Sequence, residues 1–143
     1  VPYVLSQYSN DKVQGLANVL RQSGYYTAFF HGAPNGSMGF QAFSKTTGFN
    51  DYYGLTEYGN DDDFDGLWGI WDEPFLQYYV DKQSSFKQPF FTTLFTVSSH
   101  HPYVLLAQYE NTFKGGKLEI YRTIQYTDYA LRKYFENSKL TKT

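Results

Sequence analysis

Segments with helical spacing alternate with short apolar runs along this chain, and this alternation is the feature that most constrains its fold. Helices are predicted over residues 11–23, 39–46, 74–86 and 117–138, and strands over 25–30, 49–53 and 90–98. Strands joined through a helix within one sheet form right-handed parallel crossovers. The sequence therefore predicts an α/β fold in which a parallel-type sheet is flanked by helices.

Capping signals set the expected helix boundaries. Ser9 or Asn10 is predicted to cap the first helix, and Gly24 ends it. Asp72 is predicted to cap the third helix, with Pro74 at the first helical position, where its missing N–H costs nothing. Residues 54–73, which lie between the second predicted strand and the third helix, have too little periodicity to predict a long element.

Composition excludes several classes of function. The 143 residues make one domain, and a net charge of −2 with scattered Lys and Arg argues against a nucleic-acid partner. The absence of cysteine excludes disulfides, thiolate metal sites and a cysteine nucleophile. No apolar run approaches the roughly 20 residues that span a bilayer. Because the chain begins without Met, has no signal peptide and ends in a polar helix, we interpret it as an internal fragment of a longer protein.

Histidines follow two of the predicted strands. The string TVSSHHPY, from Thr96 to Tyr103, places His100 and His101 after the apolar strand PFFTTLFTV, and His31 ends the strand YYTAFF. Ligands collect at the carboxyl edge of open α/β sheets. We therefore expect His31 and His100 to face one pocket. The alternative for His31 is a loop histidine bonded to a neighbouring carbonyl, and one member of the His100–His101 pair is expected to be structural or merely exposed.

The acidic stretch between the second strand and the third helix resembles the start of a calcium loop. The pattern D-x-D-x-D-G occurs at Asp61, Asp63, Asp65 and Gly66. A calcium loop that began at Asp61 would have its twelfth position at Asp72. A glutamate is expected at that position, but the nearest one lies one residue later. We favour a solvated acidic loop with an Asp-Gly turn, and a calcium site is the alternative.

Other local motifs have weaker implications. Trp68 and Trp71 either stack on a ligand or anchor their loop to the core, and we favour the anchor. Ser98 and Ser99 lie near histidines, but without a G-x-S-x-G elbow they do not support a hydrolase triad. The glycines of HGAPNGSMG match neither phosphate-binding fingerprint, so nucleotide binding has no support.

Five consecutive blocks together resemble one family: YYTAFFHGAPNGSMGF, GFNDYYG, DFDGLWGIWDEPFLQYY, PFFTTLFTVSSHHPY and TIQYTDYALRKYF. They are similar to the sulfatase-like branch of the alkaline phosphatase superfamily, which includes lipoteichoic acid synthases and other phosphoglycerol transferases. The resemblance implies an α/β sandwich, of which residues 1–143 form the central part, truncated at both ends. It also implies a membrane-anchored parent protein whose catalytic domain lies outside the cytoplasm.

The resemblance further implies where the chemistry lies. The parent would use a threonine nucleophile and a divalent metal, manganese or magnesium, to cleave or transfer a phosphate or sulfate ester. The nucleophile and an acidic ligand lie upstream of this chain in the family and an Asp-His metal pair lies downstream; no Asp-His dipeptide occurs here. We therefore expect no metal on this chain and no activity from it alone.

The same resemblance assigns the histidines. It implies that His31 and His100 bind substrate and stabilise the transition state, with His101, Trp68 and Asp72 as secondary candidates. Met38, Gly39 and Phe40 stand where lipoteichoic acid synthases have a Trp and an Arg that help to bind glycerol phosphate, so that specificity is not implied.

Two further expectations concern partners. A truncated sheet exposes edge strands, so this chain is expected to self-associate. The alternative to an enzyme is a non-catalytic module in which an aromatic cleft and the histidines hold a glycan or a lipid headgroup.

Overall fold

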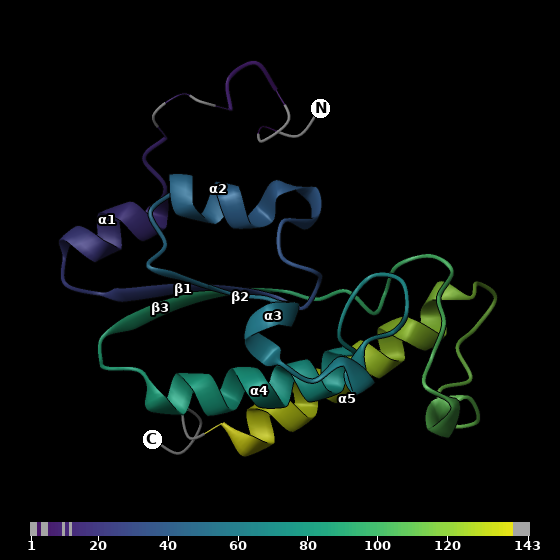
Figure 1. Cartoon of the computed structure of the whole chain (residues 1–143). Coiled ribbons are helices and arrows are strands. Elements are labelled where there is room, and N and C mark those ends of the chain that lie inside the picture. The colour runs from purple at the N-terminus through teal and green to yellow at the C-terminus, as the bar shows by residue number, and fades with distance from the viewer. Residues whose placement is uncertain (1–2, 4–5, 10, 12, 139–143) are drawn as a thin grey trace.

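The computed structural model describes residues 3, 6–9, 11 and 13–138 and contains one sheet between two helical layers (Figure 1). The strands are β1 (Tyr26–His31), β2 (Asp51–Tyr53) and β3 (Phe90–Phe95). They lie in the order β2-β1-β3 and all pair in parallel. The predicted α/β fold with a parallel sheet is confirmed.

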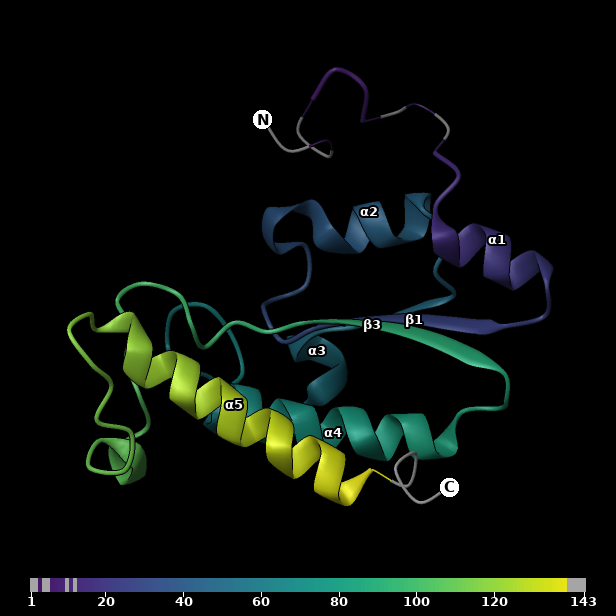
Figure 2. The same cartoon turned by 180° about the vertical axis from the view of Figure 1, so that it is seen from behind.

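Helices cover both faces of this sheet. α1 (Leu16–Gln22) and α2 (Phe40–Thr46) lie over one face, and α3 (Leu55–Tyr58), α4 (Asp72–Ser85) and α5 (Ile120–Asn137) lie over the other (Figures 1 and 2). The connections contain the 3₁₀ turns η2 (Ser37–Gly39), η3 (Asp61–Asp63) and η4 (Ala107–Tyr109). No helix within the described ranges is long and apolar enough to cross a membrane.

The central strand β1 is buried because both of its faces are covered. Its side chains alternate between the two layers. Phe30 packs on Tyr79 of α4 with ring centroids 4.6 Å apart, whereas Phe29 and His31 contact Phe40 of α2 at 6.2 and 4.7 Å. The strand therefore places His31 on the α2 side of the sheet.

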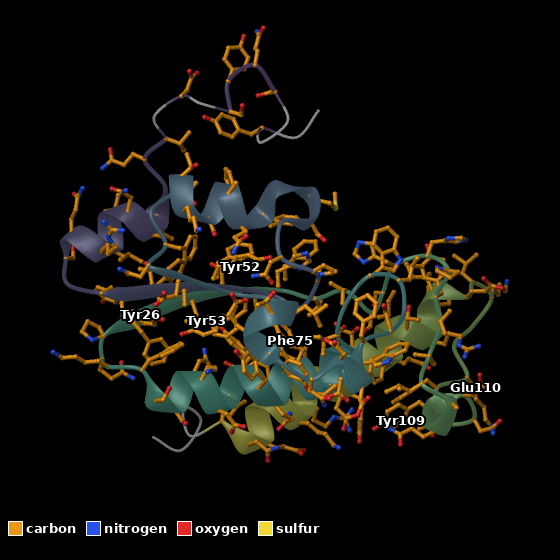
Figure 3. All side chains as sticks on the ribbon, viewed as in Figure 1. Tyr26, Tyr52, Tyr53, Phe75, Tyr109 and Glu110 are labelled. Carbon is orange, nitrogen blue, oxygen red and sulfur yellow. The ribbon has the colours of Figure 1, made fainter. Side chains whose placement is uncertain are left out.

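Aromatic residues fill both layers of the core. In Figure 3, Tyr52 lies on the α2 side of the sheet and Tyr53 and Phe75 lie on the α4 side. The Phe30 ring stacks on Tyr53 at 4.5 Å and meets Phe75 at 6.5 Å. Much of the aromatic content thus packs the core, although part of it lines the pocket described below.

The helix boundaries differ from the prediction, and α5 begins at Ile120 rather than at residue 117. The first helix begins at Leu16 rather than at residue 11, because Gly15 has an extended backbone (φ −82°, ψ 167°). The predicted cap at Asn10 lies outside the described residues. α4 begins at Asp72 with Trp71 as its N-cap, so Asp72 lies in the first turn and Pro74 is the third residue of the helix.

The strand boundaries differ as well. The third strand ends at Phe95 rather than at residue 98, because the N–H groups of Val97 and Ser98 donate to the carboxylate of Asp72 instead of a neighbouring strand. Residues 54–71 contain only the short elements α3 and η3, as predicted for a stretch with too little periodicity for a long element.

Polar contacts hold α4 against α5. Lys133 Nζ lies 2.5 Å from Glu73 Oε1, and the Tyr109 hydroxyl donates to the same carboxylate. Further along, the Tyr134 hydroxyl donates to Gln83 Oε1 at 2.9 Å. These contacts join the two helices near the start and near the end of α4.

Candidate functional site

A pocket of about 230 Å³ lies at the carboxyl edge of the sheet, where β1 and β3 end. Three segments form it: the end of β1 with the loop that follows, the loop before α4, and the segment after β3. Its lining residues are His31, Ala33, Pro34, Ser37, Met38, Leu67, Trp68, Phe95, Val97 and His100. The structure thus brings His31 and His100 together, and the two tryptophans, His101 and Asp72 take different positions.

His31 is the last residue of β1 and pairs in register with Phe95 of β3. It is 3% exposed, and its ring lies 4.7 Å from Phe40 and 5.0 Å from Phe95. Its Nδ1 lies 3.4 Å from the Phe95 carbonyl oxygen. Because a carbonyl only accepts, Nδ1 carries the proton and Nε2 of the neutral ring is left as an acceptor.

Burial lowers the pKa of His31 from its ordinary value. The Phe95 carbonyl opposes this shift, because it stabilises the protonated ring, and the nearby His100 adds to it through repulsion between like charges. His31 is therefore neutral near pH 7, with an acceptor nitrogen available at the pocket.

His100 belongs to the segment after β3 and is exposed at the pocket rim. Its Nδ1 lies 3.0 Å from the carbonyl oxygen of Val97, so this nitrogen also carries the proton. Its ring lies 5.2 Å from Trp68 and 6.4 Å from Phe95. Both histidines therefore use Nδ1 for the backbone and have only Nε2 for a ligand.

Trp68 forms one wall of the pocket. Its indole N–H donates to the His101 carbonyl at 2.6 Å, which joins the loop before α4 to the segment after β3. Asp65 Oδ1 holds this loop by accepting from the backbone N–H groups of Leu67, Trp68 and Gly69 at 2.8, 2.7 and 3.0 Å.

The same loop lies against the end of β1 at Gly69. A Cβ at this position would lie 2.7 Å from the carbonyl oxygen of Gly32, the residue after His31, and the next N–H, of Ile70, donates to that oxygen at 3.0 Å. Only glycine permits this close approach. The loop is therefore fixed to the strand end that carries His31.

The two tryptophans have separate roles. Trp71 is 7% exposed and meets Tyr126 edge-on at 6.2 Å, so it anchors the loop to the core as we favoured. Trp68 is 40% exposed and lines the pocket instead. The prediction of a core anchor is therefore right for Trp71 and wrong for Trp68.

His101 and Asp72 do not line the pocket. The His101 ring packs against Tyr103 at 5.7 Å, and its carbonyl receives the Trp68 N–H. Asp72 is 2% exposed and its carboxylate binds the backbone after β3. Their contribution to a site is thus indirect.

The hydrogen bonds that Asp72 makes outside its own helix come from residues distant in sequence. Oδ1 accepts from the N–H groups of Val97 and Ser98 at 2.9 and 3.1 Å, and Oδ2 accepts from the Thr127 hydroxyl at 2.6 Å. The Asp72 N–H donates to Ser98 Oγ at 2.9 Å. Sequence reasoning missed Thr127, because a hydroxyl on the inner face of a helix has no distinctive pattern.

The acidic loop is not arranged as a metal site. Asp63 accepts from the Tyr58 hydroxyl and from Asn60, Asp65 caps backbone groups, and Asp72 is buried elsewhere. Within the part of the chain that the structure describes, no three His, Cys, Asp or Glu side chains are grouped so that they could hold a metal. These residues support neither the calcium alternative nor a resident divalent metal.

Comparisons with known proteins agree with this architecture. The sulfatase family model matches residues 1–139. Lipoteichoic acid synthase 1 of Bacillus subtilis is 28% identical over 132 residues, which cover 88% of this chain and 21% of the relative. The chain thus spans about a fifth of the length of such curated relatives.

Solved structures show the same fold. A protein in the alkaline phosphatase superfamily from Vibrio parahaemolyticus superposes with a TM-score of 0.77 at 28% identity, covering 94% of this chain and 33% of its own. The lipoteichoic acid synthase LtaP from Listeria monocytogenes superposes with a TM-score of 0.72 at 20% identity. The match covers 90% of this chain and 33% of the LtaP chain. With nearly its whole length matched by the family model, this chain belongs to the sulfatase family.

Proposed function

We propose that residues 1–143 are the central part of the catalytic domain of an extracytoplasmic, membrane-anchored enzyme. This enzyme would transfer phosphoglycerol groups or hydrolyse phosphate or sulfate esters. Membership of the sulfatase family and similarity to lipoteichoic acid synthases support the class of reaction. The observation that carries the proposal is the convergence of His31 and His100 on one pocket at the carboxyl edge of the sheet.

The two histidines would hold the ester through Nε2, since Nδ1 of each is bonded to the backbone. A neutral imidazole accepts a hydrogen bond from a hydroxyl, whereas a protonated one donates to an anionic oxygen. Burial keeps His31 neutral near pH 7, so we assign it to a substrate hydroxyl. His100 lies at the exposed rim and uses Nδ1 for the Val97 carbonyl, so we assign its Nε2 to the ester group.

Other parts of the protein would supply the rest of the site. The threonine nucleophile and a manganese or magnesium ion are implied by the family, and the described residues do not form a metal site. This chain alone would then bind part of the substrate without turning it over.

The chemistry of the residues that line the pocket indicates which class of substrate it would bind. Met38 and Trp68 contribute apolar surface, and none of the lining residues is Lys or Arg. Selection for glycerol phosphate by a basic side chain therefore has no counterpart among them. We accordingly propose a phosphate or sulfate ester without a narrower substrate.

The test uses the full-length protein with manganese and two chromogenic esters, bis(p-nitrophenyl) phosphate and p-nitrophenyl sulfate. His31→Gln and His100→Gln are each expected to lower kcat/KM roughly 100-fold, the loss typical of removing one preorganised transition-state contact. His101→Gln is the matched control and should retain wild-type turnover, because its ring lies outside the pocket.

Wild-type turnover in both pocket variants would refute the proposed roles. Binding of a glycan or a lipid headgroup without hydrolysis of either ester would favour the non-catalytic module. The isolated 143-residue chain should show no turnover under the same conditions.

Self-association of the isolated chain stays a prediction. Within the described residues, the outer edges of β2 and β3 pair with no further strand. Exposed edges are templates for pairing with another chain. Light scattering that reports a monomer at high concentration would contradict this expectation.

A further inference from the structure

We infer that Asp72 is a positioning residue for His100 and acts through the single peptide group that joins Val97 to Ser98. This inference rests on the proposed function, because it matters for turnover only if His100 binds the ester. Asp72 itself does not line the pocket. Its influence must therefore pass through the backbone of the segment after β3.

The geometry places one peptide group between the carboxylate and the imidazole. The Ser98 N–H donates to Asp72 Oδ1 at 3.1 Å, and the Val97 carbonyl accepts from His100 Nδ1 at 3.0 Å. This N–H and this carbonyl are the two ends of the same planar unit. Fixing its N–H on Asp72 therefore fixes the direction of the carbonyl that orients His100.

A second contact removes the remaining freedom of this segment. The Val97 N–H donates to the same Asp72 oxygen at 2.9 Å. The N–H groups of two successive peptides thus donate to one carboxylate oxygen. Neither peptide group can rotate without losing a buried hydrogen bond. His100 receives its orientation from this arrangement although it lies in a loop.

The charge of Asp72 adds to its geometric effect. Hydrogen bonds in a chain polarise one another, so a carboxylate at the N–H end makes the carbonyl at the other end a better acceptor. A stronger Val97 acceptor favours the tautomer with the proton on Nδ1 and leaves Nε2 for the ligand. In serine hydrolases an aspartate performs this task by direct contact with histidine; here a peptide group stands between them.

Asp72 is itself held firmly enough to serve this purpose. It is 2% exposed, and Thr127 of α5 donates its hydroxyl to Oδ2 at 2.6 Å. Its own N–H donates to Ser98 Oγ at 2.9 Å. It also lies in the first turn of the 14-residue helix α4, where a negative charge is favoured.

The test combines kinetics with NMR of the full-length protein labelled with ¹⁵N at histidine only, in magnesium buffer. The His100 signals are assigned by their loss in His100→Gln. In the wild type at alkaline pH we expect a protonated Nδ1 and an unprotonated Nε2. In Asp72→Ala we expect a mixture of tautomers at His100, with the His31 signals unchanged.

Asp72→Asn separates charge from geometry. The amide oxygen can still accept from both N–H groups, so the tautomer should be retained, while the Nδ1–H proton signal moves upfield because its acceptor is weaker. We expect kcat to fall about 10-fold to 100-fold in Asp72→Ala, the range for loss of a partner that orients a histidine, and by less in Asp72→Asn. KM should change little in both.

Asp65→Asn is the matched control. Asp65 also binds backbone N–H groups at the pocket rim, but those of the Trp68 loop rather than those of the His100 segment. The His100 signals of the Asp65→Asn variant should match those of the wild type. If Asp72→Ala fails to fold, Asp72→Asn decides the question alone.

Unchanged His100 signals in the folded Asp72 variants would overturn the inference. The NMR readout needs no substrate, so it is independent of the proposed function. A shifted tautomer in a protein whose His100→Gln variant retains full turnover would uphold the link between Asp72 and His100 and refute the proposed role of His100.

Discussion

His31 and His100 line the same pocket but are held there in opposite ways. His31 is buried in the central strand, with its ring packed against both Phe40 and Phe95. His100 lies in an exposed segment whose backbone is bound by Asp72. The sheet itself places the first histidine, whereas a buried side chain places the second. Substitutions outside the pocket should therefore affect the two histidines differently.

The largest effect is expected at Asp72. Asp72→Ala leaves two buried N–H groups and a hydroxyl without their acceptor, and it should lower the free energy of unfolding by about 3–5 kcal/mol. Urea denaturation measures this loss. Asp65→Ala removes a similar number of bonds in an exposed loop, where water replaces them, and should cost about 1 kcal/mol. Equal losses in the two variants would contradict the importance of burial.

A smaller effect is expected where the Trp68 loop meets the strand of His31. Gly69→Ala forces a methyl group against the Gly32 carbonyl and should destabilise the protein by about 1–3 kcal/mol. Thermal unfolding monitored by tryptophan fluorescence measures the change. In the control Gly24→Ala, the methyl group meets nothing within 4 Å and only its positive φ of 85° is unfavourable. The close contact would be disproved if Gly69→Ala were as stable as the wild type.

The burial of His31 predicts how stability changes with pH. Its pKa is lower in the folded protein than the ordinary value of 6.5, so below that pH the unfolded chain binds more protons. Stability should therefore fall as the pH drops below about 6.5 towards the lower folded pKa. His31→Gln should flatten this part of the profile, measured as free energy of unfolding between pH 5 and 7.5. His101→Gln provides the comparison, and an unchanged slope in His31→Gln would count against the shift.

The smallest effect is expected at the contact between the two loops. Trp68→Phe keeps an aromatic wall but loses the indole N–H that binds the His101 carbonyl. It should cost about 1 kcal/mol, because water reaches the exposed carbonyl. The same urea titration measures it, with Trp68→Leu as a second variant that also loses the ring contact to His100. A loss as large as that of Asp72→Ala would mean that Trp68, rather than Asp72, holds the His100 segment.

Periodicity and topology allowed much of the site to be predicted from the sequence. The apolar run that ends at His31 had to form a buried strand, and parallel crossovers bring the ends of β1 and β3 to one edge. The five motif blocks also predicted the family that the comparisons show. These signals are local or repeat along the chain, so they can be read without coordinates.

Polar contacts across the fold could not be predicted in the same way. Asp72 looked like a helix cap, and the apolar run to residue 98 looked like continuous strand. The structure instead pairs Asp72 with the backbone after Phe95 and with Thr127, which is 55 residues away in sequence. Trp68 and Trp71 are chemically equivalent in the sequence, yet one lines the pocket and the other is buried.

The amino-acid sequence by itself determined the order of the elements, the parallel sheet and the edge at which the two histidines meet. It did so because hydrophobic periodicity and the handedness of crossovers depend on local pattern and chirality. Only the tertiary structure decided which histidine is buried and what holds the other. Those outcomes depend on hydrogen bonds among buried groups that become neighbours only after the helices pack on the sheet.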